Sequence, residues 1–174
     1  MVATRALVLL GFACFAVTPA LTGLTACTAG TSSTNCALDT TCTSGADLKT
    51  YINLTRDQMA TATITACLNG GCDTGTPASI PSSPGDRLAI NLNGALSIQG
   101  FISSPDPIKG YLIEANFILS DSNPMNGDAY QLYATSNGQQ ASGSINQTAT
   151  YTKTTPNGAD CPPVCENATI DQTK

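Results

Sequence analysis

The sequence contains no histidine and no tryptophan among its 174 residues, and aromatic residues make up only 5% of it. Without histidine, neither a Ser-His-Asp triad nor a Cys-His pair has its general base, so these hydrolase mechanisms are excluded. Paired carboxylates need no histidine, but the acidic residues are scattered singly and fall mostly in predicted turns. We therefore expect no catalysis, and a polysaccharide hydrolase with paired carboxylates stays as an alternative.

Basic residues are scarce. From Cys27 onward there are six lysines and arginines against twelve aspartates and glutamates, and no basic cluster occurs. Nucleic acids bind to a concentrated positive face, so we expect no nucleic-acid partner. The sequence also carries no pattern that predicts a cofactor. We expect a monomer.

Long apolar runs are missing after residue 26, so no segment there reaches the ~20 residues of a membrane-spanning helix. The start of the chain differs. Residues 1–5 carry positive charge, and residues 6–17 (ALVLLGFACFAV) form an apolar stretch that is short for a membrane span. This order is typical of an export signal peptide.

Residues 24–27, Leu-Thr-Ala-Cys, resemble the lipobox of bacterial lipoproteins. The resemblance implies cleavage before Cys27 and attachment of lipid to its thiol. It predicts a signal peptide over residues 1–26, a flexible lipidated tether over 27–35 (small and polar), and a folded domain over 36–174. The alternative is cleavage after Ala20, which would leave Cys27 as an ordinary half-cystine.

Cysteine parity favours lipidation of Cys27. Six cysteines then remain, an even set that pairs completely in an oxidising compartment: Cys36, Cys42, Cys67, Cys72, Cys161 and Cys165. Without histidine, disulfides are favoured over a metal site. We expect a disulfide between Cys67 and Cys72 across a hairpin. For the other four, local pairs (Cys36–Cys42, Cys161–Cys165) compete with cross pairs (Cys36–Cys161, Cys42–Cys165), which are favoured if the first and last strands adjoin.

Short alternating stretches separated by turn residues predict an all-β fold. Residues 55–58 are predicted to form a turn, Asn93-Gly94 a two-residue hairpin, and residues 111–119 a central strand. Seven to nine strands at such spacing indicate a disulfide-stabilised, immunoglobulin-like Greek-key β-sandwich. The expected strands lie near residues 48–54, 59–67, 88–92, 96–102, 111–119, 130–134, 142–152 and 168–170.

Asp128 and Tyr130 are arranged as in a tyrosine corner, in which a tyrosine hydroxyl bonds to nearby backbone. The preceding loop is a weak calcium candidate through Asp121, Asn123, Asn126 and Asp128. Its glycine falls at the seventh position, where an EF-hand loop has it at the sixth, and no glutamate follows at the twelfth. A turn built on Asx residues is therefore the favoured interpretation, without a metal.

Four features together resemble a known group of proteins: the lipobox leader, the paired cysteines Cys36 and Cys42 at the start of the domain, the segment Ala62-Thr-Ile-Thr-Ala-Cys67 with Cys72 close behind, and the tail Tyr151…Pro156-Asn157-Gly158…Cys161-Pro-Pro-Val-Cys165…Ala168-Thr-Ile. They are similar to small, uncharacterised, cysteine-rich lipoproteins of myxobacteria and their relatives. The resemblance implies an immunoglobulin-like domain behind a lipid anchor, and it implies no particular activity.

These observations predict a lipid-anchored binding or structural module of the bacterial cell envelope, on the outer membrane because Thr28 is not an aspartate. Its partner would be an envelope protein or glycan, bound through the loops at residues 76–86 and 121–128. Two alternatives stay open. One is the envelope polysaccharide hydrolase; the other is a secreted eukaryotic surface glycoprotein, for which Asn53, Asn146 and Asn167 begin glycosylation sequons.

The lipobox interpretation predicts a mature chain that starts at Cys27 and carries lipid. Two or more acyl chains give stable anchoring, whereas one chain holds only marginally. Intact-mass analysis of membrane-extracted protein should find this species, and Cys27→Ser should stay unprocessed or become soluble. An unmodified chain that begins at Leu21 would contradict the interpretation.

Overall fold

The computed structural model of the protein describes residues 42–119, 123–159 and 161–174. The predicted signal peptide, Cys27, the tether and Cys36 lie outside these residues. Within the described ranges, no helix has the length and apolar character that crossing a membrane requires.

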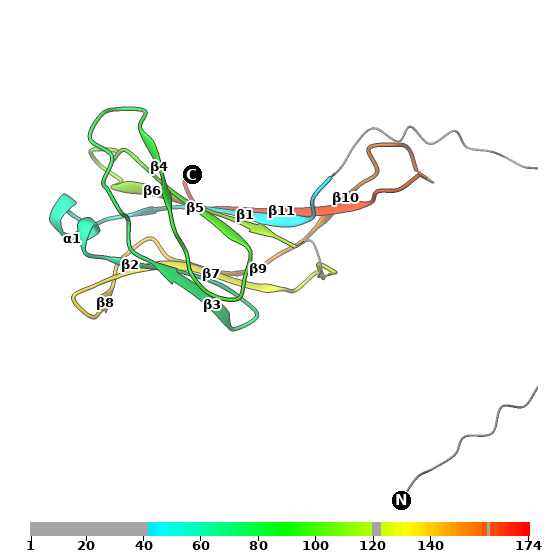
Figure 1. The fold of residues 1–174 in the computed structure, drawn as a ribbon, viewed down its shortest axis with the longest axis horizontal. Helices are drawn as coiled ribbons and strands as arrows, with labels where there is room; N and C mark the ends of the chain where they lie inside the picture. The colour runs from blue at the N-terminus through cyan, green and yellow to red at the C-terminus, as the bar shows by residue number, and fades with distance from the viewer. Residues whose placement is uncertain (1–41, 120–122, 160) are drawn as a thin grey trace, which may run out of the picture. The chain divides into compact units, whose positions relative to one another are not determined.

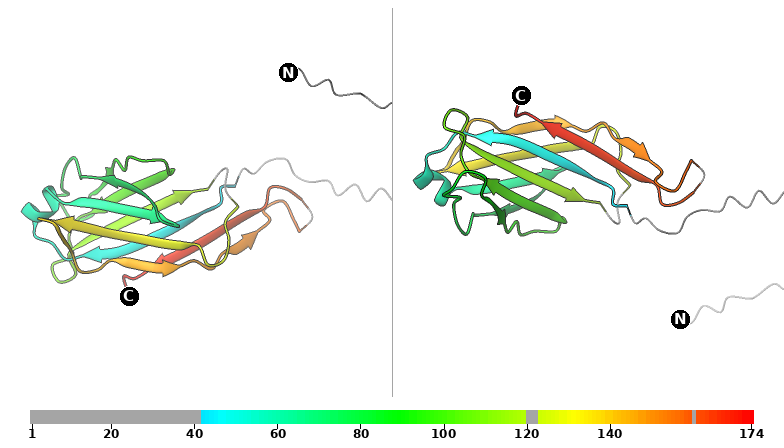
Figure 2. Two further views of the ribbon diagram at one scale, coloured as in Figure 1. Left: turned by 90° about the horizontal axis from the view of Figure 1, so that it is seen from below. Right: turned by 90° about the horizontal axis from the view of Figure 1, so that it is seen from above.

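The fold is predominantly β, with strands in two sheets and one five-residue helix among the described residues, α1 (Arg56–Ala60). Sheet A contains six strands in the order β10-β11-β1-β6-β5-β4, and sheet B contains β3-β2-β7-β8 with β9 also paired to β7 (Figures 1 and 2). The strands are β1 (Gly45–Ile52), β2 (Thr63–Leu68), β3 (Gly71–Gly75), β4 (Arg87–Ile90), β5 (Ile98–Ser103), β6 (Tyr111–Ile118), β7 (Ala129–Ser136), β8 (Gln139–Gln140), β9 (Ile145–Thr148), β10 (Thr152–Thr154) and β11 (Cys165–Asp171).

The two sheets pack face to face, because each strand turns its apolar side chains to one side. In β1, Ala46, Leu48 and Ile52 are buried, whereas Asp47 is exposed and Lys49 and Tyr51 are partly exposed. The ring of Phe117 from sheet A meets the ring of Tyr130 from sheet B edge to face, with 4.9 Å between centroids. The core therefore lies between the sheets and joins them (Figure 1).

Strand β6 lies centrally in sheet A, between β1 and β5, as its apolar sequence predicted. Strand β1 has β6 antiparallel on one side and β11 parallel on the other. Because β1 and β11 run in the same direction, the residues before their first positions lie at the same end of the sheet. Cys42 there forms a disulfide with Cys165, 123 positions later, which is one of the two expected cross pairs. Cys161 is also disulfide-bonded.

The hairpin of β2 and β3 is closed by Cys67–Cys72, the pair that the sequence predicted. Asn69 and Gly70 form its turn with φ of 49° and 86°. Both angles are positive, as a two-residue hairpin turn requires, and asparagine and glycine adopt them at little cost. The two cysteines are opposite residues in the ladder, so the turn places them within reach of each other.

Residues 55–60 do not form the predicted turn and strand start. Thr55 accepts a hydrogen bond from the Gln58 N–H, and the Gln58 side chain accepts one from the Thr55 N–H, which is a capping box. This cap starts helix α1, whose Met59 is fully buried in the core. Strand β2 consequently begins at Thr63 instead of at Met59.

The prediction of a single strand over residues 142–152 is also wrong. The chain forms β9 in sheet B, leaves that sheet, and forms β10 in sheet A. Ala149 is buried between the two strands, and its N–H donates to the carbonyl of Asp128. This split and the two-residue strand β8 contribute to a total of eleven strands among the described residues, above the predicted seven to nine.

Tyr130 is fully buried, but it does not form the predicted tyrosine corner. Its hydroxyl bonds to the hydroxyl of Tyr151 instead of to backbone, and the Tyr151 hydroxyl donates to Asp128 Oδ2 over 3.3 Å. Asp128 also accepts from the side-chain amide of Asn69 at 2.9 Å. Burial raises the pKa of both tyrosines, so both phenols stay protonated and able to donate. The network joins β7 to the crossover between β9 and β10.

Tyr130→Phe should lower the free energy of unfolding by about 1 kcal/mol, because it removes one buried hydrogen bond. Tyr151→Phe should cost more, about 2–3 kcal/mol, since it removes two hydrogen bonds and leaves the buried Tyr130 hydroxyl unpaired. Tyr133→Phe, on the same strand but partly exposed, serves as the control and should change stability by less than about 0.5 kcal/mol. Urea unfolding measures all three. Equal losses for Tyr130→Phe and Tyr133→Phe would contradict the network.

Candidate functional site

Strands β4 and β5 pair as far as Ile90 and Gly100 and then separate. The chain between them, residues 91–97, leaves sheet A and crosses to the edge of sheet B (Figure 1). There Asn93 and Thr74 exchange two backbone hydrogen bonds, at 2.8 and 3.2 Å. We call the opening between the diverging chains the fork. The predicted two-residue hairpin at Asn93-Gly94 is therefore wrong, although the pairing of its flanking strands is right.

Asp73 on β3 holds the crossing segment in place. Its side chain is 1% exposed, and Oδ1 accepts a hydrogen bond from the Leu96 N–H at 3.2 Å. Gly94 lies directly against this carboxylate, so that a Cβ atom at Gly94 would be 1.7 Å from Oδ1. A larger residue at this position would force the segment or the Asp73 side chain to shift.

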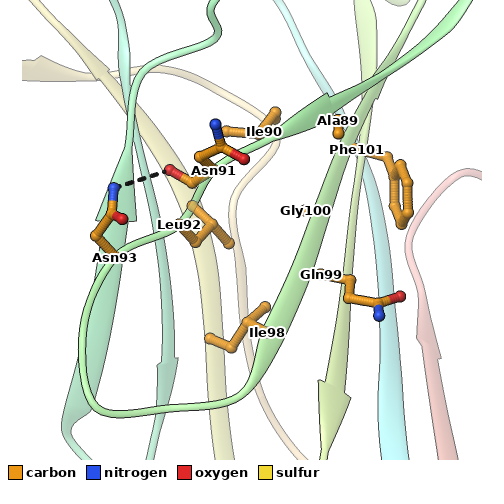
Figure 3. A pocket seen from close by; sticks show the side chains of 9 residues that line it. All are labelled: Ala89, Ile90, Asn91, Leu92, Asn93, Ile98, Gln99, Gly100 and Phe101. Carbon is orange, nitrogen blue, oxygen red and sulfur yellow. Dashed lines mark hydrogen bonds between the residues drawn. The ribbon is translucent and has the colours of Figure 1, made fainter.

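The fork contains a pocket of about 620 Å³ (Figure 3). This volume is within the usual range for small-molecule sites. The side chains of Ile90, Leu92 and Ile98 are apolar, whereas three lining residues carry amides that are exposed to solvent. None of the nine lining residues carries a charge; they are Ala89, Ile90, Asn91, Leu92, Asn93, Ile98, Gln99, Gly100 and Phe101.

From the fork, a line of polar side chains crosses the outer face of sheet A. Gln99 is opposite Asn116 of β6, which is opposite Asp47 of β1, which is opposite Thr169 of β11. Residues paired in this way project to the same side of a sheet. Gln99, Asp47 and Thr169 are exposed and Asn116 is partly exposed. We call these four residues the polar row.

A line of charged side chains runs beside the polar row. Glu114 Oε1 is 2.9 Å from Lys49 Nζ, and Glu114 Oε2 is 2.7 Å from Arg87 Nε. Burial alone would raise the pKa of Glu114, but the hydrogen bonds and charges of Lys49 and Arg87 outweigh it and hold the pKa below its usual value. The Arg87 guanidinium also lies 3.6 Å from the ring centroid of Phe101. Glu114 therefore stays ionised, and its two ion pairs link β6 to β1 and β4.

Of the calcium candidate's residues, Asn126 and Asp128 serve the scaffold, and Asn123 is exposed. Asp121 lies outside the described residues. Asn126 Oδ1 accepts the Tyr151 N–H at 2.7 Å, and Asp128 Oδ2 accepts the Met125 N–H at 3.0 Å. These oxygens of the calcium candidate are thus directed to protein donors. Asp128 itself is 8% exposed.

Several remaining carboxylates hold turns. Asp86 accepts from the Ser82 and Ser83 N–H groups, Asp106 from Ile108 and Lys109, and Asp171 from Thr173. The backbone donors also lower the pKa of Asp106. These contacts explain why the sequence places acidic residues singly between strands.

A second hollow of about 480 Å³ lies on sheet B and is lined by Ala129, Asn146, Gln147 and Thr148. It has polar residues but no apolar floor, which distinguishes it from the fork. Both hollows are formed by residues outside the loops at 76–86 and 121–128, to which the sequence analysis assigned binding. The fork was missed because Asn93-Gly94 is a strong local hairpin signal, and only contacts with Asp73 and Thr74 redirect the chain.

Comparison with protein-family models, with curated proteins and with solved structures finds no match for this chain.

Gly94→Ala should lower the free energy of unfolding by about 1–3 kcal/mol, because the added methyl overlaps Asp73 and must displace the segment. It should also speed hydrogen exchange at the Leu96 amide, whose acceptor is Asp73. Gly71→Ala is the matched control, since a Cβ there meets its nearest atom at an ordinary 3.5 Å. If the two variants lose the same stability and Leu96 exchange is unchanged, the role assigned to Asp73 and Gly94 is wrong.

Proposed function

We propose that this protein is a lipid-anchored binding module of the bacterial cell envelope, that it works without catalysis, and that it binds through the fork. The observation that carries the proposal is the fork itself: an open pocket with an apolar floor and uncharged polar residues at its rim. Small-molecule sites commonly have this composition. Its β5 wall is paired with β6, and its other wall is held by the backbone bonds between Asn93 and Thr74, so the site is preformed.

The absence of catalysis is supported by what the acidic side chains do. Glu114 is neutralised between two cations, and Asp86, Asp106 and Asp171 hold turns. A general acid for glycoside hydrolysis needs a raised pKa. The pKa of Glu114 is instead lowered, which favours a structural role for the most buried acid of sheet A.

An extracytoplasmic location is supported by the disulfides Cys42–Cys165 and Cys67–Cys72, since such bonds persist in oxidising compartments. The lipobox resemblance at residues 24–27 supplies the anchor and the assignment to the outer membrane. The resemblance to cysteine-rich lipoproteins of myxobacteria agrees with both parts of the proposal.

We further propose that the two sheets form an immunoglobulin-like Greek-key sandwich. The chain alternates between them, since β2 and β3 belong to sheet B, β4 to β6 to sheet A, β7 to β9 to sheet B, and β10 and β11 to sheet A. Such crossing connections are typical of Greek-key sandwiches. Cys42–Cys165 and Cys67–Cys72 do not have the inter-sheet position of the disulfide in antibody domains, because Cys67–Cys72 closes one hairpin and Cys165 is in the same sheet as the strand that follows Cys42.

The fork should be required for binding of envelope material. Immobilised wild-type protein, incubated with fractionated envelope extract, should retain material that the double variant Asn91→Ala/Gln99→Ala does not retain. Asn146→Ala/Gln147→Ala removes the same amides from the second hollow and should bind like the wild type. Equal retention by all three proteins would contradict the assignment of binding to the fork.

A further inference from the structure

The fork offers three side-chain amides at its rim: Asn91, Asn93 and Gln99. An amide both donates and accepts hydrogen bonds, so it pairs with a hydroxyl in either orientation. A carboxylate or an ammonium group is restricted to one role. The Asn93 amide already donates to the Asn91 carbonyl oxygen at 3.3 Å. Asn91 and Gln99 are therefore the amides that suit a ligand whose own groups are hydroxyls, without selecting for a charge.

The floor of the fork is apolar. The apolar side chains that line it include those of Leu92 and Ile98, which are partly exposed, and Ile90, which is buried; Figure 3 shows the Gln99 side chain on the other side of β5 from Ile98. A pyranose ring matches this pattern, since its C–H faces are apolar and its rim carries hydroxyls. A ring over Leu92 and Ile98 would bond through its hydroxyls to the Gln99 and Asn91 side chains, which also line the fork, in the way that a few polar groups orient a ligand over an apolar surface.

The polar row provides further hydrogen-bonding side chains next to the fork. It starts at Gln99, which also lines the pocket, and adds an amide at Asn116, a carboxylate at Asp47 and a hydroxyl at Thr169. Four adjacent strands span about 14 Å at the ~4.8 Å spacing of a sheet. A chain of about three linked rings extends over that distance.

The charge of the protein around the polar row favours uncharged oligosaccharides over anionic ones. The protein carries a formal net charge of −5, and Asp47 places a carboxylate within the polar row. The cations Lys49 and Arg87 beside the row are already paired with Glu114. An anionic polysaccharide would meet repulsion here without a free cation to offset it, whereas an uncharged one would not.

We infer that the fork and the polar row form one binding site for an uncharged oligosaccharide of about three pyranose units. One terminal ring occupies the fork, and the following rings lie across Asn116 and Asp47 towards Thr169. This inference rests on the proposed function, because it names the ligand class of the same site.

An extended peptide is the competing occupant, because β4 is the edge strand of sheet A. A peptide added there would bond to the β4 backbone, and its affinity would come from main-chain groups. The side chains of Gln99 and Asn116 are on other strands and would not affect it. The side-chain amides of Gln99 and Asn116 therefore favour the oligosaccharide, and substitution of these side chains separates the two.

The test uses the full membrane-extracted chain, titrated with maltotriose, cellotriose and chitotriose and, for comparison, with trigalacturonate. We expect at least one neutral trisaccharide to bind and to shift the side-chain amide NMR signals of Gln99 and Asn116. Gln99→Ala should weaken that binding about tenfold or more. Asn116→Ala should weaken the trisaccharide more than the corresponding monosaccharide, since only the longer ligand reaches β6.

The matched control is Gln131→Ala/Asn146→Ala. These two residues are likewise opposite each other on neighbouring strands, β7 and β9, but in sheet B. The control should bind the trisaccharide like the wild type. The inference is overturned if no neutral trisaccharide binds, if trigalacturonate binds more tightly, or if Gln99→Ala and the control lose affinity equally.

Failure of this inference is distinguishable from failure of the proposed function. If envelope material is retained in a fork-dependent way while every trisaccharide fails, the fork is a binding site for another ligand class. If retention is also independent of the fork, the proposed function fails with the inference.

Discussion

The parallel pairing of β1 with β11 is the constraint on which the rest of this fold depends. It brings two segments together that are separated by most of the described chain, and it places Cys42 beside Cys165. A link over 123 positions removes far more freedom from the unfolded chain than a link over five, by about 5 against about 2 kcal/mol on the loop-closure estimate. With β1 held by β11, its other edge is a fixed template for β6, and β6 for β5. The polar row crosses β5, β6, β1 and β11, so its geometry depends on the same pairing.

The composition of the core explains why cross-links and buried polar contacts carry so much of the stability. Many of its buried side chains are small, because alanine occupies a large share of the positions between the sheets. Burial contributes in proportion to apolar area, so small side chains contribute little each. The network of Tyr130, Tyr151 and Asp128 adds specific hydrogen bonds between β7 and the crossover to sheet A. Lys49, Glu114 and Arg87 tie three strands together on the outer face.

Local patterns predicted the elements whose contacts are local. Alternation at Leu48 and Ile52, the turn at Asn69-Gly70 and the apolar stretch of β6 are all determined by neighbouring residues, and the structure contains them. Thr55 and Gln58 also have the spacing of a capping box, but the sequence analysis predicted a turn there. The helix that this box starts is only five residues long, so it leaves little periodic pattern in the sequence. The fork and the split at Ala149 could not be predicted in this way. At both places, residues distant in the sequence determine the path of the chain. Asp73 and Thr74 bond to residues 91–97 and hold them at sheet B, and the Asp128 carbonyl accepts the Ala149 N–H where the chain changes sheets.

The most direct test of the central role of β1 and β11 compares the loss of long-range and local links. One variant replaces Cys42 and Cys165, with the predicted pair Cys36 and Cys161, by alanine; the other replaces only Cys67 and Cys72. Unfolding by urea, with hydrogen exchange followed at β1 and β11, measures both. The account predicts that the first variant loses about 5 kcal/mol or more and that protection disappears first at β1 and β11, while the second loses about 2 kcal/mol and keeps that protection. A larger loss for the hairpin variant, or unchanged protection of β11 in the first, would contradict it.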